Sequence, residues 1–225
     1  QAPLPPVNAD GTYTNSGVRS SYAQFMEGNG QWDKNLTVVT TTGLNIHFIK
    51  DVLTLRGDFS YKAIRRARER ARTPIDMYNA PGVATAYYTQ AQSYKSRWTY
   101  DTDYMSANAV LTWTPKLGEN HSLNVVGGWN LEDYKYHRFY IQRKGMIFPE
   151  NFDSYELFDG TEINVEQSNS DYGLVGFFGR VNYTLFNRYI VEVSARYDGS
   201  SKYDENNRWG FFPGVSVGWI FGKEI

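Results

Sequence analysis

The stretch from Arg188 to Ile225 alternates apolar and polar residues, and this alternation restricts the possible folds more than any other feature. In its first run, Val191 and Val193 share one face of an extended backbone, and Glu192 and Arg196 share the other. A period of two residues is typical of a β-strand whose faces meet different surroundings. We therefore interpret the first run as a strand with one apolar and one charged face.

The second run, residues 209–219, carries a tryptophan at each end of its apolar face. At about 3.3 Å per residue the run spans about 33 Å, and a strand tilt of about 40° shortens that span to about 25 Å. An apolar band between two aromatic girdles is typical of an outer-membrane β-barrel. The two runs predict these lipid-facing residues: Val191, Val193, Val215, Val217, Trp209 and Trp219.

The same alternation recurs upstream and predicts an array of seven strands. Short turns near residues 50, 117 and 187 alternate with long connections near residues 80, 155 and 202. Alternate turns of an up-and-down barrel lie on the same rim, so we expect the short turns to be periplasmic and the long loops extracellular. The expected strands cover residues 31–48, 52–61, 98–114, 121–133, 172–185, 188–198 and 209–219.

The amino-acid composition further narrows the class of protein to which the chain can belong. The 225 residues are 16% aromatic with 18 Tyr, which suits a membrane interface. A formal net charge of -1 gives no signal for nucleic-acid binding, and the lack of Cys excludes disulfides and thiolate metal sites. No apolar run approaches the roughly 18 residues that a membrane-spanning helix needs. Because the chain opens on QAPLPPVNADG, a loop-like sequence, we expect it to be an internal piece of a longer protein.

Residues Arg196 to Glu224, RYDGSSKYDENNRWGFFPGVSVGWIFGKE, carry a recognisable motif order. They resemble a late barrel hairpin of the SusC/RagA family of TonB-dependent (TonB-linked) outer-membrane transporters, in which an RxDGSS run, an NNRxGxFPSVSxGW run and a short acidic turn follow one another. Asp204 and Glu205 replace a frequent Gly-Pro, and Gly214 replaces a frequent Ser. These departures fall at variable positions.

The resemblance implies an all-β fold, an antiparallel up-and-down transmembrane β-barrel segment with long extracellular loops. Residues 1–225 would form part of the C-terminal half of the barrel, with 1–30 as an extracellular loop and 31–225 as strands and loops. The plug domain and the TonB box of the family have no counterpart in these residues. Seven strands leave two unpaired edges, which are costly in lipid, so we expect the rest of the barrel to come from a longer chain.

The same resemblance implies active import of an oligosaccharide (glycan) or peptide nutrient across the bacterial outer membrane. The implied partners are a SusD-like surface lipoprotein, TonB, outer-membrane lipid and lipopolysaccharide. Two alternatives remain open at this point. A passive porin would show the same strands without a plug, and a soluble or surface glycan-binding β-protein would need a second sheet to cover the apolar face.

Enzymatic chemistry and bound cofactors are not expected. No serine lies in a GxSxG elbow, no glycine-rich loop precedes a helix, and the three His are far apart in the sequence. The adjacent carboxylates Glu132 and Asp133 point to opposite faces of a strand, so they cannot flank one bond.

Two charged clusters have both a simple and a functional interpretation. Asp198, Asp204 and Glu205 crowd one loop with oxygen donors that could hold calcium, but their spacing follows no EF-hand register, and we expect no metal site. The basic run from Arg65 to Arg72 is interpreted as the solvated base of a long loop, with binding of lipopolysaccharide phosphate or of an anionic ligand as the alternative.

Tyrosines in the long loops are the feature that we connect to ligand capture, because Tyr stacks on sugar rings or peptide side chains at low entropic cost. The alternative is that they pack on neighbouring loops. Charged residues on the inner strand faces would complete the ligand-facing set. The predicted ligand-facing residues are Tyr87, Tyr88, Tyr155, Arg56, Asp58 and Arg196.

Overall fold

The computed structural model describes residues 5–19, 21–27, 29–80, 82–147, 155, 158–159 and 162–223. Within these ranges the side chains of Asn79, Ala80, Thr85, Ala86, Tyr88 and Gln90 lie outside the description. The chain divides into two compact units. Unit 1 comprises Gln1–Leu36, Arg65–Asp101 and His137–Asn169, and unit 2 comprises Thr37–Ile64, Thr102–Tyr136 and Ser170–Ile225.

Seven strands form one sheet in the order β1-β2-β5-β6-β7-β8-β9, so each strand lies beside the next long strand in the chain. The predicted all-β meander of about seven strands is therefore confirmed. Within the described residues, β1 and β9 are the two edges of this sheet. The strands are β1 (Gly30–Ile49), β2 (Leu53–Arg72), β5 (Tyr94–Trp113), β6 (His121–Lys144), β7 (Ile163–Leu185), β8 (Tyr189–Ser200) and β9 (Trp209–Trp219).

Three strands are longer than the sequence predicted. The second was expected to end at Tyr61 but continues to Arg72, the fourth continues from about residue 133 to Lys144, and the fifth begins at Ile163. These predicted boundaries were wrong because the apolar face ends before the strand does. The basic run from Arg65 to Arg72 consequently lies in β2, and its interpretation as the base of a loop was also wrong.

The length of these strands exceeds what a membrane requires. Strand β2 has 20 residues and β6 has 24, whereas about 9 to 11 residues suffice for a tilted strand to cross a bilayer. Each of these strands therefore has room for a segment outside the hydrocarbon region. No described helix has both the length and the apolar character that crossing a membrane demands.

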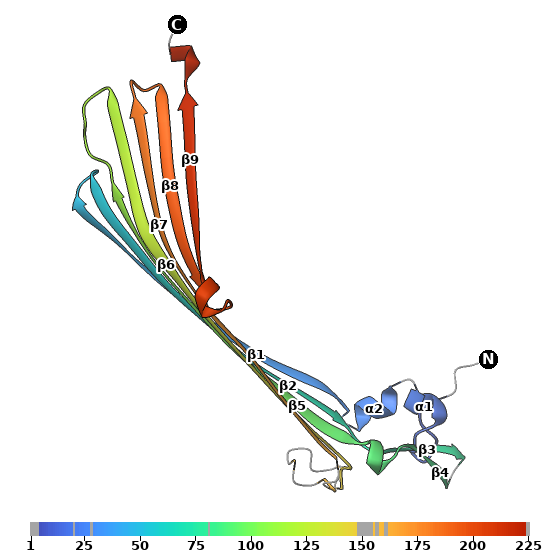
Figure 1. The fold of residues 1–225 in the computed structure, drawn as a ribbon. Helices are drawn as coiled ribbons and strands as arrows, with labels where there is room; N and C mark the ends of the chain where they lie inside the picture. Colours follow the sequence, from blue (N-terminus) through green and yellow to red (C-terminus); the bar gives the residue numbers. More distant parts are fainter. Residues whose placement is uncertain are drawn as a thin grey trace. The chain divides into compact units, whose positions relative to one another are not determined.

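In unit 2, β8 pairs antiparallel with both β7 and β9 (Figure 1). Phe186 and Asn187 adopt positive φ angles of 51° and 55°, which allows the chain to reverse between β7 and β8. The register joins Val191 to Val217 and Val193 to Val215. These valines form two adjacent cross-strand pairs on one face of the sheet, as the alternation predicts.

In unit 1, two short helices lie beside a β-hairpin (Figure 1). Helices α1 (Asn15–Arg19) and α2 (Tyr22–Met26) pack against the hairpin of β3 (Ile75–Ala80) and β4 (Val83–Tyr88), and the 3-10 helix η1 (Gln90–Gln92) follows. Five-residue helices are too short to show helical periodicity, so the sequence did not reveal them. The buried residues Val18, Ala23 and Ile75 form the centre of the cluster, with Tyr13, Met77 and Tyr87 packed against it.

Tyr13 ties the N-terminal segment to this cluster. Its carbonyl accepts a hydrogen bond of 2.8 Å from the Tyr78 amide, and its hydroxyl donates one of 2.6 Å to Glu27 Oε1. The Glu27 carboxylate raises the pKa of Tyr13 to about 12. The remaining short elements are η2 (Glu205–Asn207), in the loop between β8 and β9, and η3 (Phe221–Lys223), after β9.

Candidate functional site

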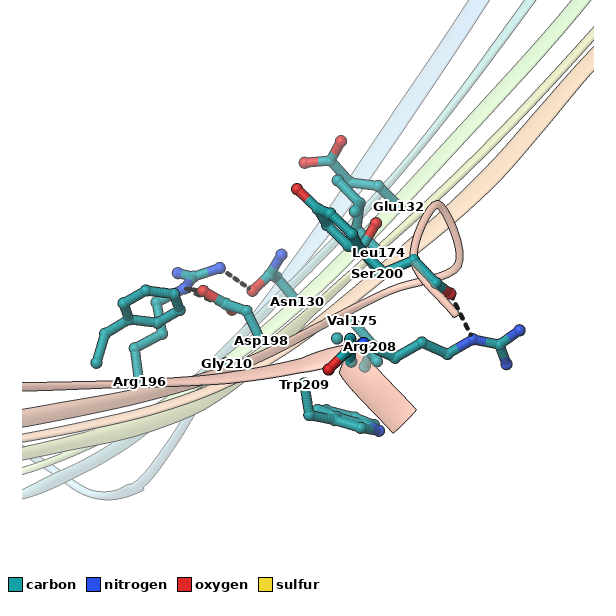
Figure 2. Close-up of a pocket in the computed structure, with 14 residues that line it drawn as sticks. Asn130, Glu132, Leu174, Val175, Arg196, Asp198, Ser200, Arg208, Trp209 and Gly210 are labelled. Atoms are coloured by element: carbon teal, nitrogen blue, oxygen red, sulfur yellow. Dashed lines mark hydrogen bonds and ion pairs between the residues drawn. The ribbon is translucent and has the colours of Figure 1, made fainter. Parts of the chain in front are cut away.

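A hollow of about 440 Å³ lies in unit 2, among strands β6 to β9 and the loop between β8 and β9 (Figure 2). Polar side chains from β6 and β8 line one part of it, namely Asn130, Glu132, Arg196 and Asp198. Arg208 and Trp209, at the start of β9, line another part. The hollow therefore lies within the segment that carries the RxDGSS and NNRxG motifs.

Arg196 is the centre of the polar part. Its Nε lies 2.7 Å from both carboxylate oxygens of Asp198, and its Nη2 donates a 2.8 Å hydrogen bond to Asn130 Oδ1 (Figure 2). Its guanidinium carbon lies 5.9 Å from the centroid of the Phe178 ring. The sequence placed Arg196 on the polar face of its strand as a ligand contact. The structure brings it together with Asp198 on that face, so much of its hydrogen-bonding capacity is already used within the protein.

A glycine on the neighbouring strand β7 makes room for this cluster. Asp198 pairs across the sheet with Gly176 on β7 and with Gly210 on β9. A Cβ atom on Gly176 would meet the Asp198 carboxylate, and it would lie 2.5 Å from Asn130 Oδ1 and 2.8 Å from Arg196 Nη2. The Arg196–Asp198–Asn130 cluster can therefore lie flat on β7 only because residue 176 has no side chain.

On the opposite face, a glycine supports the tryptophan of the second motif. Gly199 pairs with Trp209, and a Cβ on Gly199 would lie 2.9 Å from the indole ring. The same indole stacks on Tyr197, with ring centroids 4.7 Å apart and an interplanar angle of 11°. An aromatic ring laid over a strand glycine in this way fixes strand register. The RxDGSS and NNRxG residues thus hold the β8–β9 hairpin in register.

The possible calcium ligands are not gathered into a site in the part of the chain that the structure describes. There, no group of three or more His, Cys, Asp or Glu residues could hold a metal ion. Asp198 is paired with Arg196, while Asp204 and Glu205 lie at the start of η2 in the exposed loop.

Arg56 and Asp58 lie two residues apart on β2 and form an ion pair of 3.3 Å. The Arg56 side chain is 69% exposed and the Asp58 side chain 34%. An exposed pair of this kind contributes about 0 to 1 kcal/mol to stability. The two charges therefore remain accessible to a ligand on the polar face of β2.

Of the three tyrosines predicted to face a ligand, the structure describes the side chains of Tyr87 and Tyr155. Tyr87 packs on the small cluster of unit 1, and the side chain of Tyr88 lies outside the described residues. Tyr155 lies 5.1 Å from Lys95 Nζ, measured to the ring centroid, and Arg143 donates a hydrogen bond to its carbonyl. Burial raises the pKa of Tyr155 to about 12. Tyr87 and Tyr155 thus make packing contacts within the protein.

A second group of residues lies in unit 1, and it includes arginines of the basic run for which an anionic ligand was the alternative interpretation. Strand β2 places Arg66, Arg68, Arg70 and Arg72 on one face, and the neighbouring strand β5 contributes Tyr94, Trp98 and Tyr100. We call these seven residues the basic-aromatic face. The sequence signal was present, since arginines at every second position predict one strand face. It was missed because the alternation in this stretch is not one of hydrophobicity.

On the other face of the same strands, two arginines form ion pairs between β2 and β5. Arg65 lies 3.5 Å from Asp101, and Arg97 lies 3.4 Å from Glu69. In a helix, Glu69 would lie within reach of Arg65 or Arg66. In the strand it instead pairs with Arg97 on β5.

The hollow in unit 2 and the basic-aromatic face in unit 1 both present groups that can bind a ligand. Guanidinium groups, amides and aromatic rings form hydrogen bonds, ion pairs and stacking contacts with a ligand.

Comparison with known proteins identifies related chains. The family model described as "TonB dependent receptor-like, beta-barrel" matches residues 2–225. The TonB-dependent receptor SusC of Bacteroides thetaiotaomicron is 34% identical over 122 residues, which cover 53% of this chain and 11% of the relative. The TonB-dependent receptor P3 of Formosa agariphila is 34% identical over 130 residues, which cover 55% of this chain and 12% of the relative.

Solved structures agree in fold. The RagAB peptide transporter matches 91% of this chain and 22% of its own with a TM-score of 0.71 at 20% identity. The RagAB peptide importer in its "open-open" state matches 87% of this chain and 20% of its own with a TM-score of 0.67 at 21% identity. The alignments thus span about a tenth of each curated relative and about a fifth of each solved chain.

The glycine beneath the Arg196 cluster provides a test of this geometry. We expect Gly176→Ala to destabilise the full-length protein by about 1 to 3 kcal/mol, because the added methyl group must displace the cluster. Gly179→Ala is the matched control on the same strand, since its Cβ would lie 3.8 Å from the nearest atom, the Val126 carbonyl oxygen. Denaturant unfolding of both variants measures the difference. Equal midpoints would contradict the packing described for Gly176.

Proposed function

The chain belongs to the TonB-dependent receptor-like β-barrel family, and from that premise we propose that it forms part of an outer-membrane active importer of oligosaccharide or peptide. TonB would energise this importer through parts of the protein outside these residues. A SusD-like surface lipoprotein would serve as its extracellular partner. Support for the partner comes from the SusC relative and the RagAB fold match.

The observation that carries this proposal is the arrangement of the β8–β9 face. Val191 pairs with Val217 and Val193 with Val215, and Val215 and Val217 are 75% and 79% exposed. Stacked aromatic pairs close the band at both ends, Tyr197 on Trp209 and Tyr189 on Trp219. An exposed valine band between two aromatic pairs is what a strand in lipid requires.

The two alternatives, a soluble or surface glycan-binding protein and a passive porin, account for fewer of these observations. A soluble or surface glycan-binding protein would leave this apolar face in water, where large exposed patches promote association. A passive porin would have the same lipid-facing band, so only dependence on TonB separates it from an importer. The relatives named as TonB-dependent receptors favour the importer.

The surroundings of the sheet follow from the same proposal. Lipid would cover the valine band, and lipopolysaccharide would surround the extracellular part of that face. Strands β1 and β9, as edges of the described sheet, would pair with further strands of the same barrel, because unpaired backbone groups in lipid cost several kcal/mol each.

The lipid-facing assignment can be tested by charge placement. We expect Val215→Arg to destabilise the full-length protein in lipid vesicles by roughly 2 to 4 kcal/mol, since residue 215 lies near the middle of the apolar band and a charge at mid-membrane depth loses its hydration. The control is Ser216→Arg, which places the same charge on the opposite face, where residue 216 pairs with Glu192. Reversible unfolding in denaturant measures the free energy of unfolding of both variants. Similar losses of stability in the two variants would overturn the face assignment.

The topology can be tested by labelling intact cells with an impermeant thiol reagent. In a cysteine-free background of the full-length protein, Asp204→Cys should react, because the β8–β9 loop is expected to be extracellular. Lys50→Cys, in the exposed turn between β1 and β2, should react only after the cells are opened. Reaction of Lys50→Cys in intact cells would invert the topology.

The transport function is tested by nutrient uptake with and without TonB. Cells that carry the full-length protein should lose uptake of the cargo when TonB is deleted and regain it on complementation. Uptake that persists without TonB would favour the passive porin. Conversion of the cargo into a product by the purified protein would favour an enzyme.

A further inference from the structure

Four arginines recur at every second position of β2, from Arg66 to Arg72. Alternate residues of a strand share a face, so the row extends over about 20 Å at about 3.3 Å per residue. These arginines lie an even number of positions from Arg56 and Asp58, so they share that face of the strand. The apolar Leu55 lies on the other face. The row therefore lies on the polar face of β2, the face that would line the lumen.

Side-chain contacts in unit 1 support this placement. Asp33 on β1 lies 3.4 Å from Arg66 and 2.8 Å from Arg68. The guanidinium carbons of Arg70 and Arg72 lie 6.0 Å and 5.1 Å from the centroid of the Tyr94 ring. Side chains of neighbouring strands make such contacts only when they share a face.

The aromatic partners extend this face along β5. The guanidinium carbon of Arg66 lies 5.8 Å from the centroid of the Tyr100 ring. Trp98 stacks on Tyr140 of β6, with ring centroids 4.6 Å apart and an interplanar angle of 27°. One strand thus supplies cations at every second residue, while its neighbour supplies flat apolar rings.

Both faces of these strands carry more cations than carboxylates, and the excess is larger on the basic-aromatic face. On the opposite face, Arg65 and Arg97 each have a carboxylate partner, Asp101 and Glu69. On the basic-aromatic face, the segments of β1, β2 and β5 in unit 1 carry four arginines and a single carboxylate, that of Asp33. The segments of β1, β2 and β5 therefore give the basic-aromatic face an excess of positive charge.

A polar hollow of about 310 Å³ adjoins the end of the row that Arg70 and Arg72 form. Arg70, Arg72 and Tyr94 line it together with the amide side chains of Gln24, Asn29 and Gln31. Among the described residues, Arg70 makes no ion pair. Two guanidinium groups, three amides and an aromatic ring therefore meet around one space large enough for a ligand group.

Asn29 is held in place at the edge of this hollow. Its Oδ1 accepts hydrogen bonds from the amide and from the hydroxyl of Thr73, the latter at 3.1 Å. The chain therefore fixes the position of this side chain beside Arg70 and Arg72.

We propose that the basic-aromatic face and the adjoining hollow bind an anionic oligosaccharide through its carboxylate or sulfate groups. This inference rests on the proposed import function, which it narrows to an acidic cargo. The planar fork of Arg binds a carboxylate or sulfate through two parallel hydrogen bonds. The rings of Trp98 and Tyr100 stack on sugar faces, and the amides of Asn29 and Gln31 bind hydroxyl groups. Lipopolysaccharide is not the ligand of this row, because the row lies on the face that would line the lumen and lipopolysaccharide would surround the outside of the barrel.

Binding by the purified full-length protein in detergent tests this inference without any need for TonB. The probes are oligogalacturonate for carboxylate, a heparin-derived oligosaccharide for sulfate, a maltooligosaccharide as the neutral control and oligo-glutamate for an acidic peptide. We expect at least one acidic oligosaccharide to bind about tenfold or more tightly than the neutral one, and its binding to weaken as salt screens the charges.

The variant Arg70→Gln/Arg72→Gln should weaken binding of the acidic oligosaccharide about tenfold or more, since each arginine supplies charge-assisted hydrogen bonds. The matched control, Arg65→Gln/Arg97→Gln, removes two charges from the opposite face and should change binding less than about twofold. Arg70→Lys keeps the charge but removes the fork, so it should bind with intermediate affinity. This single substitution serves if the double variant does not assemble.

Equal binding of acidic and neutral oligosaccharides, or unchanged binding in both Arg70 variants, would overturn the inference. Tighter binding of oligo-glutamate than of either acidic sugar would also overturn it, in favour of an acidic peptide. Failure of the import function has a different signature. Uptake that persists without TonB would leave the binding preference intact while removing the active importer.

Discussion

The structure depends on one constraint, which is that backbone N–H and C=O groups inside a membrane must be hydrogen-bonded to the protein itself. A sheet meets this constraint between strands, so every β-strand except those at the edges is bonded on both sides. The side chains are then free to differ between the two faces. Period-two alternation follows directly, and with it the separation of Val191 and Val217 from Glu192 and Arg196.

Much of the fold could be predicted because a lipid-facing surface leaves a hydrophobic signal in the sequence. The seven strands and their order along the sheet follow from that signal and from the short turns. The strand ends could not be predicted, because both faces of residues 62–72 and 134–144 carry polar side chains. Because charged side chains occur on both faces there, a hydrophobicity pattern does not mark these residues as strand. The helices of residues 15–19 and 22–26 were missed for lack of length.

The candidate site was predictable in part, for a related reason. The face on which Arg196 lies follows from its position in a single strand, but the room for its cluster depends on Gly176, which belongs to another strand. Only the register between β7 and β8 shows that Gly176 lies opposite Asp198. Tyr155 illustrates the same limit, since no local pattern in the sequence indicates that its ring lies against Lys95.

The consequences of a misplaced strand end are largest for the arginines. If residues 65–72 formed a loop, their charges would point in many directions and could be neutralised separately by solvent and counterions. In a strand, Arg65 and Glu69 turn to one face, while Arg66 to Arg72 turn to the other at every second residue. Like charges held about 7 Å apart repel one another. Such a row is stabilised by a counter-charge, and Asp33 supplies one for Arg66 and Arg68. The backbone constraint that forms the strand thus also creates a face that favours an anionic ligand.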